Sequence, residues 1–115
     1  MTVVIYHNPR CGKSRQTLQL LREQGIEPEI IEYLKTPPSP EDLDNILQNL
    51  GMEPRDLMRK KEAEYKASGL DDQTLDRQAL INGMVSHPIL IERPIVIAND
   101  KAAIGRPPKA VLSIL

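Results

Sequence analysis

The chain has 115 residues, with 15 Lys or Arg and 16 Asp or Glu, so its formal net charge is −1. This length is typical of a single domain that buries roughly two-thirds of its unfolded surface and needs no disulfide or metal to fold. A nucleic-acid or anionic-membrane binder would carry a basic excess, and no apolar run approaches the ~20 residues of a membrane span. We therefore expect neither nucleic acid nor membrane as a partner.

The N-terminal third shows a strand, a loop, a helix and a second strand. Residues 2–6 form a β-branched run typical of a buried strand, and the HNPRCG loop follows it. Three leucines among good helix formers predict a helix over residues 14–24, with Gly25 as its stop, and residues 29–33 predict the next strand. This βαβ order implies parallel strands joined by a right-handed crossover.

Proline-rich residues 36–40 interrupt the chain and prepare a helix start. Ser39 is a candidate N-cap, with Asp42 three residues further on. Residues from 41 to about 83 have a helical pattern throughout, punctuated by glycines and Pro54. We expect a helical insertion over about residues 40–83.

The C-terminal third returns to strand character. Residues 89–91 and 94–98 are apolar and β-branched, Asn99-Asp100 is a turn signal, and residues 102–105 can pair as a further strand. Pro107-Pro108 can start a last helix that ends at Leu115. The element order predicts an α/β sheet domain with a helical insertion.

The stretch HNPRCGKSR contains the only cysteine, Cys11, just where the first helix is expected to begin. Free backbone N–H groups at a helix N-terminus favour an anion, whether an oxyanion or a thiolate. Lys13 and Arg15 add positive charge, and Ser14 can donate a hydrogen bond to sulfur or to an oxyanion. Such surroundings lower a cysteine pKa from ~8.5 to somewhere in ~3.5–7.5. The pattern favours a nucleophilic Cys11, and a buried structural cysteine is the alternative.

One cysteine excludes an internal disulfide, and a free thiol persists best in a reducing compartment, so we expect a cytoplasmic protein. No metal site is expected, because the two histidines lie eighty positions apart.

Three motifs together resemble the glutaredoxin-dependent arsenate reductase family over essentially the whole chain. They are HNPRCGKSRQTL at residues 7–18, LMRKK with the following Glu64-Tyr65 and Gly69-Leu70, and HPILIERPIV at residues 87–96. The resemblance implies one thioredoxin-like domain over residues 1–115, with a mixed four-stranded sheet and the helical insertion. It also implies arsenate, or a similar oxyanion, as substrate. Glutathione would be the co-substrate and glutaredoxin the protein partner, with no bound cofactor.

The resemblance also assigns roles to individual residues. Cys11 would be the nucleophile and Ser14 a hydrogen-bond partner of its thiolate, while His7 would tune the thiol or support the loop. Guanidinium groups offer paired donors that keep their charge, which suits a tetrahedral oxyanion. The family's three oxyanion-binding arginines correspond to Arg59, Arg93 and Arg106. The family also implies a cis proline facing the cysteine, at Pro94. We expect a monomer.

Two alternatives remain open from the sequence. A thioredoxin-like regulator similar to the Spx group would bind RNA polymerase, although that group usually carries Cys-x-x-Cys where this chain has Cys11-x-x-Ser14. A monothiol glutaredoxin has a similar Cys-Gly-x-Ser motif, but the HNPR and Arg-Pro motifs are foreign to it.

Overall fold

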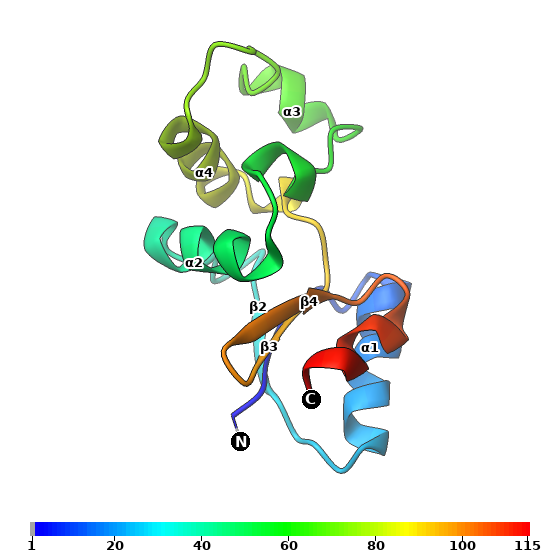
Figure 1. Ribbon diagram of the computed structural model, residues 1–115. Helices are drawn as coiled ribbons and strands as arrows, with labels where there is room; N and C mark the ends of the chain where they lie inside the picture. Colours follow the sequence, from blue (N-terminus) through cyan, green and yellow to red (C-terminus); the bar gives the residue numbers. More distant parts are fainter. Residues whose placement is uncertain (1) are drawn as a thin grey trace. The chain divides into compact units, whose positions relative to one another are not determined.

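The computed structural model describes residues 2–115, which form two compact units (Figure 1). The first unit comprises the chain up to Thr36 together with Arg93–Leu115, and the second is Pro37–Glu92. No helix within residues 2–115 is both long and apolar enough to cross a membrane.

The first unit is built on a four-stranded mixed sheet in the order β2-β1-β3-β4. Strand β1 (Val4–His7) pairs in parallel with β2 (Glu29–Glu32), and helix α1 (Gly12–Glu23) connects them. Strand β3 (Ile95–Ala98) is antiparallel to β1 and to β4 (Lys101–Ile104). The expected mixed four-stranded sheet is confirmed, and its central strand β1 leads directly into the cysteine loop.

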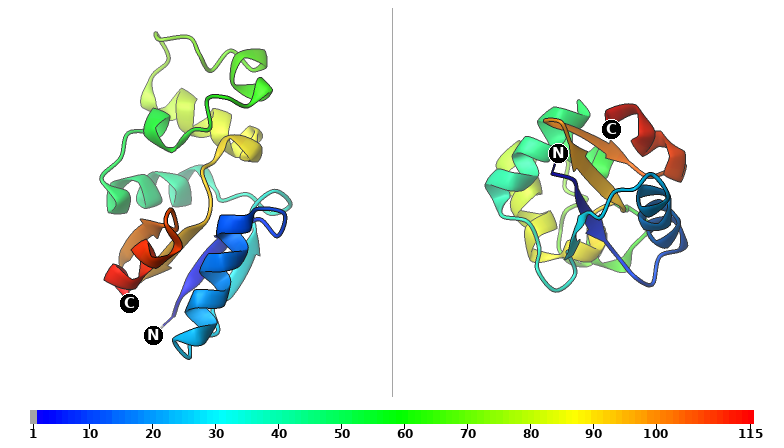
Figure 2. Two further views of the ribbon diagram at one scale, coloured as in Figure 1. Left: turned by 90° about the vertical axis from the view of Figure 1, so that its right-hand side faces the viewer. Right: turned by 90° about the horizontal axis from the view of Figure 1, so that it is seen from below.

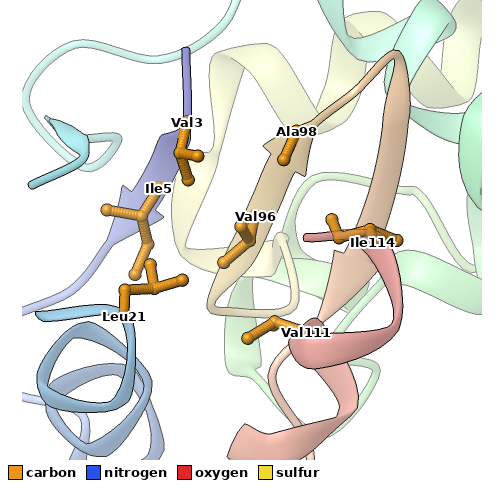
Figure 3. Packing of buried hydrophobic residues seen from close by; sticks show 7 residues of the cluster. All are labelled: Val3, Ile5, Leu21, Val96, Ala98, Val111 and Ile114. Atoms are coloured by element: carbon orange, nitrogen blue, oxygen red, sulfur yellow. The ribbon is translucent and has the colours of Figure 1, made fainter. Parts of the chain in front are cut away.

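Helix α1 and the C-terminal 3₁₀ segment η3 (Pro108–Ile114) cover the same face of this sheet (Figure 2). Between these helices and the sheet lies an apolar cluster, shown in Figure 3. Alternate residues of two strands contribute to it, Val3 and Ile5 at β1 and Val96 and Ala98 in β3, as expected for strands with one face in the core. The members of the cluster are Val3, Ile5, Leu21, Val96, Ala98, Val111 and Ile114. This packing fixes α1, and therefore its N-terminus, against the end of β1.

Strands β3 and β4 are joined by the two residues Asn99 and Asp100, both with positive φ, at 54° and 59°. A left-handed conformation at both central positions is that of a type I′ hairpin turn, and Asn and Asp tolerate it better than most residues. The turn signal in the sequence is confirmed.

The second unit is helical. It contains α2 (Pro40–Leu50), η1 (Pro54–Leu57), α3 (Ala63–Ala67), α4 (Arg77–Ser86) and η2 (Pro88–Leu90). Ser39 caps α2 by accepting a hydrogen bond from the Asp42 backbone N–H at 3.1 Å, as the sequence predicts.

One element prediction was wrong, and two others are given more detail by the structure. The apolar run at residues 89–91 is not a strand: Pro88 starts the 3₁₀ turn η2, and only an isolated bridge joins Ile91 to Met58. The predicted last helix is present as the 3₁₀ segment η3. The predicted helical insertion consists of four pieces before Pro88, separated by the non-helical residues 51–53, 58–62 and 68–76.

Candidate active site

The loop before Cys11 is closed by its own backbone and side-chain hydrogen bonds. The backbone N–H of Cys11 donates to the carbonyl of Asn8 at 3.0 Å, and the side-chain Oδ1 of Asn8 accepts from the backbone N–H of Arg10, also at 3.0 Å. The latter is an Asx turn. Arg15 donates from Nη1 to the Pro9 carbonyl at 2.9 Å and ties α1 to the loop. Cys11 is thereby held as the N-cap residue of α1.

The Cys11 sulfur lies among hydrogen-bond donors and positive charge. Nη2 of Arg106 donates to it at 3.7 Å, and the Arg93 side chain and the backbone N–H groups of Ser14 and Lys13 act on it closely enough to lower its pKa. Burial alone would raise the pKa of this thiol. The hydrogen bonds from Ser14, Arg93 and Lys13 and the charge of Arg93 outweigh burial, so the pKa of Cys11 is lowered.

Arg93 and Arg106 flank the β3–β4 hairpin in the sequence and lie next to each other in the structure. Arg93 precedes β3 and Arg106 follows β4, and Nε of Arg106 donates to the Arg93 carbonyl at 2.9 Å. The Arg93–Pro94 and Arg106–Pro107 peptide bonds are both cis. Cys11, Arg93 and Arg106, predicted as nucleophile and anion ligands, are therefore brought together within the first unit.

Ser14 and His7 form a second layer behind the cysteine. Nδ1 of His7 lies 2.6 Å from Oγ of Ser14, which also accepts the backbone N–H of Asn8 at 3.0 Å. Both side chains are buried. The Ser14 hydroxyl thus faces the loop and His7, while its backbone N–H faces the cysteine. His7 therefore contacts the Ser14 hydroxyl and helps to position the loop before Cys11.

The His7 ring makes stability depend on pH. Burial of the ring lowers the pKa of His7 below 6.5. The charge of Glu32 opposes this shift, and the charges of Arg22 and Arg15 add to it. The unfolded chain therefore binds a proton on His7 at a pH where the folded chain does not, so stability is lost as the pH falls below 6.5. We expect acidification from pH 7 to pH 5 to destabilise the wild type more than His7→Asn, whose amide can still reach Ser14. Urea unfolding at several pH values measures this, and equal pH slopes would contradict it.

Gly105 allows a close approach between the hairpin and α1. A Cβ at this position would lie 2.4 Å from Oγ1 of Thr17 and 2.7 Å from Cγ of Pro94. Thr17 cannot turn away freely, because it is buried and its hydroxyl donates to the Lys13 carbonyl at 2.8 Å. The residue next to Arg106 is therefore restricted to glycine by packing.

We expect Gly105→Ala to lower the free energy of unfolding by about 1–3 kcal/mol, the usual cost of overpacking. Thermal or urea unfolding measures it. Gly12→Ala is the matched control, since its Cβ would meet only Nη2 of Arg15, at 3.8 Å, and alanine favours a helix. An equal loss in both variants would refute the packing explanation.

Arg59, the third predicted anion ligand, belongs to the second unit. Its Nη1 lies 2.9 Å from Oε1 of Glu92 and its Nε 3.3 Å from Oε1 of Glu62. These groups border a pocket of about 470 Å³ that also contains Arg55, Lys60 and Lys61. The role of Arg59 at the cysteine site remains a prediction.

Two residues that shape the site, Asn8 and Thr17, are not predicted from the sequence. Asn8 uses its carbonyl, its side chain and its N–H to shape the loop, and the Asn-Pro dipeptide is a known turn signal that could have identified it. Thr17 has no such local signal, because its contact with Gly105 is long-range. Among residues 2–115 there is no cluster of His, Cys, Asp and Glu that could hold a metal ion.

The sheet order, the helix starting at the cysteine and the Arg-Pro pair before β3 define a protein of thioredoxin-like fold with one thiol at its site. A solved structure of the arsenate reductase from Vibrio cholerae superimposes with a TM-score of 0.96 at 55% identity, covering 100% of this chain and 98% of that one. The family model for the ArsC family matches residues 6–114. This chain belongs to the ArsC family.

Two relatives share about half of their residues with this chain over nearly its whole length. The uncharacterized protein YfgD of Escherichia coli strain K12 is 56% identical over 114 residues, which cover 98% of this chain and 96% of YfgD. An arsenate reductase of Haemophilus influenzae is 49% identical over the full length of both chains.

Proposed function

We propose that this protein reduces arsenate, or a similar tetrahedral oxyanion, through the Cys11 thiolate, with glutathione and glutaredoxin supplying the electrons. The observation that carries the proposal is the sulfur of Cys11 at the N-terminus of α1, beside the guanidinium groups of Arg93 and Arg106. The names of relatives, arsenate reductase in Haemophilus influenzae and in Vibrio cholerae, support the choice of arsenate.

In the first step, the thiolate attacks the arsenic atom. A sulfur–arsenic bond forms, one arsenic–oxygen bond breaks, and the departing oxygen leaves as water after protonation. Arg93 and Arg106 counter the negative charge of the substrate and of the crowded intermediate, as forked cationic donors do for phosphate. The lowered pKa of Cys11 increases the ionised fraction of the attacking group.

In the second step, the sulfur of glutathione attacks the sulfur of Cys11. A disulfide forms, the sulfur–arsenic bond breaks, and its electron pair stays on arsenic, which is reduced from As(V) to As(III) and leaves as arsenite. A further thiol exchange, carried out by glutaredoxin with glutathione, releases the Cys11 thiolate and forms oxidised glutathione. An outside thiol is necessary because Cys11 is the only cysteine of the chain.

The other predicted site residues take supporting roles in this proposal. His7 holds Ser14 and the loop so that the backbone N–H groups of α1 face the sulfur. Arg59 would bind the oxyanion as a third guanidinium once released from Glu62 and Glu92. The protein would act in the cytoplasm as a monomer.

The test is a coupled assay that follows NADPH oxidation with purified protein, glutathione, glutaredoxin, glutathione reductase and arsenate. We expect turnover that requires all components and stops when arsenate is omitted. Full activity without glutaredoxin would remove that partner, and no turnover with arsenate but reactivity towards another oxyanion would change the substrate. A protein that captures RNA polymerase and has an unreactive Cys11 would instead support the regulator similar to the Spx group.

A further inference from the structure

A second pocket, of about 320 Å³, lies within the first unit directly behind the cysteine loop. Four of its lining residues are the ones that immediately precede Cys11, and the others follow β2. They are His7, Asn8, Pro9 and Arg10, with Glu32, Leu34 and Lys35. Arg10, which lines this pocket, is the chain neighbour of Cys11. The pocket volume is at the lower end of the range for small-molecule sites, roughly 300–1,000 Å³.

The polar rim of this pocket has two cations and one carboxylate. Arg10 is exposed, and within residues 2–115 no ion pair engages its guanidinium. Lys35 meets Glu32 only at 3.8 Å, with the Lys35 side chain 79% exposed. Such an exposed pair is weak and exchanges readily for a ligand. Both cations are therefore available to bound carboxylates, and Glu32 is available to an ammonium group.

The remaining lining suits an uncharged connecting chain. Leu34 is 43% exposed, and Pro9 is exposed beside it, so both offer apolar surface to methylene groups. A matching ligand has two carboxylates and one ammonium at the ends of a short flexible chain. It also has a thiol in the middle of that chain, which could reach the neighbouring cysteine.

We propose that this pocket binds the charged ends of a small peptide thiol, represented by glutathione, and so holds its sulfur next to Cys11. The inference rests on the proposed function for the need of an outside thiol. It goes further by assigning the subsite and its determinants, Arg10, Lys35 and Glu32. Binding there gives selectivity for glutathione over uncharged thiols, because an uncharged thiol cannot pair with Arg10, Lys35 and Glu32.

The test measures formation of the mixed disulfide and uses no arsenate. The Cys11 thiolate attacks one sulfur of oxidised glutathione, a new disulfide forms, and one glutathione thiolate leaves. Intact-mass spectrometry gives the rate of this reaction and of the same reaction with uncharged hydroxyethyl disulfide. We expect Arg10→Ala and Lys35→Ala each to lower the ratio of the two rates about twofold to fivefold, within the range for exposed charge contacts. The double variant should lower it about tenfold or more.

Two controls remove the same charges outside the pocket. Arg22→Ala and Lys101→Ala, both at exposed positions on other elements, should leave the ratio unchanged. The rate with hydroxyethyl disulfide reports the reactivity of the thiolate itself and corrects for any change in its ionisation. An unchanged ratio in the double variant, an equal fall in the control variants, or no preference of the wild type for oxidised glutathione overturns the inference.

This assay separates the pocket from the proposed reaction. If the wild type prefers oxidised glutathione through Arg10 and Lys35 but does not turn over arsenate, the proposed pocket is supported and arsenate is excluded as the substrate. If arsenate turnover depends on glutathione but the ratio of the two disulfide rates is unchanged in the double variant, the proposed reaction is supported and the proposed pocket is excluded.

Discussion

Replacing Cys11 by serine is expected to abolish arsenate-dependent oxidation of glutathione. A serine hydroxyl at this place would remain protonated at neutral pH and is a far weaker nucleophile than a thiolate. The chain has no second cysteine that could replace it. Loss of an enzyme's nucleophile costs several orders of magnitude, so the rate should fall at least about a thousandfold, to the background of the coupled assay. Retained turnover in Cys11→Ser would falsify the thiolate mechanism.

The same variant reports the ionisation of Cys11 through stability. The pKa of Cys11 is lower in the folded chain than in the unfolded chain, so the unfolded chain binds one more proton between the two values. The ionised thiolate therefore stabilises the fold fully above the unfolded pKa of ~8.5, and this contribution is lost as the pH falls through the folded pKa. We expect the wild type to gain stability relative to Cys11→Ser as the pH is raised through this window.

Replacing Arg93 by alanine should have the second largest effect. Arg93 donates to the Cys11 sulfur and contributes positive charge, so its removal should raise the pKa of Cys11. It should also remove one forked donor from the substrate. Removal of a single preorganised donor costs roughly 100- to 1,000-fold in rate. The coupled assay measures the rate, and iodoacetamide alkylation against pH should show a midpoint displaced upward.

Two further variants make this result specific. Arg93→Lys keeps the charge without the fork, and we expect an intermediate rate and a smaller displacement of the alkylation midpoint. Arg22→Ala removes an exposed guanidinium paired with Glu27 and should leave both quantities unchanged. An unchanged alkylation midpoint in Arg93→Ala would show that this guanidinium does not stabilise the thiolate.

Much of the fold and the centre of the site can be predicted because local signals agree with the tertiary structure. The β-branched run before Cys11 and the leucines after it specify a strand and a helix, and the position of Cys11 between them follows directly. Ser39, Gly25 and the Asn99-Asp100 pair mark ends and turns that the structure confirms. The position of Cys11 at a helix N-terminus predicts a lowered thiol pKa, whereas the contribution of Arg93 and Arg106 is implied only by the family resemblance.

The failures come from segments where local pattern and context disagree. Residues 89–91 are apolar and β-branched, and Leu90 and Ile91 are buried, so burial alone does not distinguish a strand from a 3₁₀ turn. Pro88 at the start of that turn decides the outcome. The packing of Thr17 against Gly105 joins positions far apart in the chain, and single-sequence periodicity contains no information about such a contact.

The hairpin register gives the far turn an influence on anion binding. Ile95 pairs with Ile104, so Arg93 and Arg106 leave the hairpin at the same end, while Asn99 and Asp100 close the other. A slip of one residue in a hairpin moves every side chain of one strand to the opposite face. Insertion of a single residue after Asn99 would thus change the spacing of the two guanidinium groups without touching either of them. The length of this turn therefore helps to determine how Arg93 and Arg106 are placed to bind a tetrahedral anion.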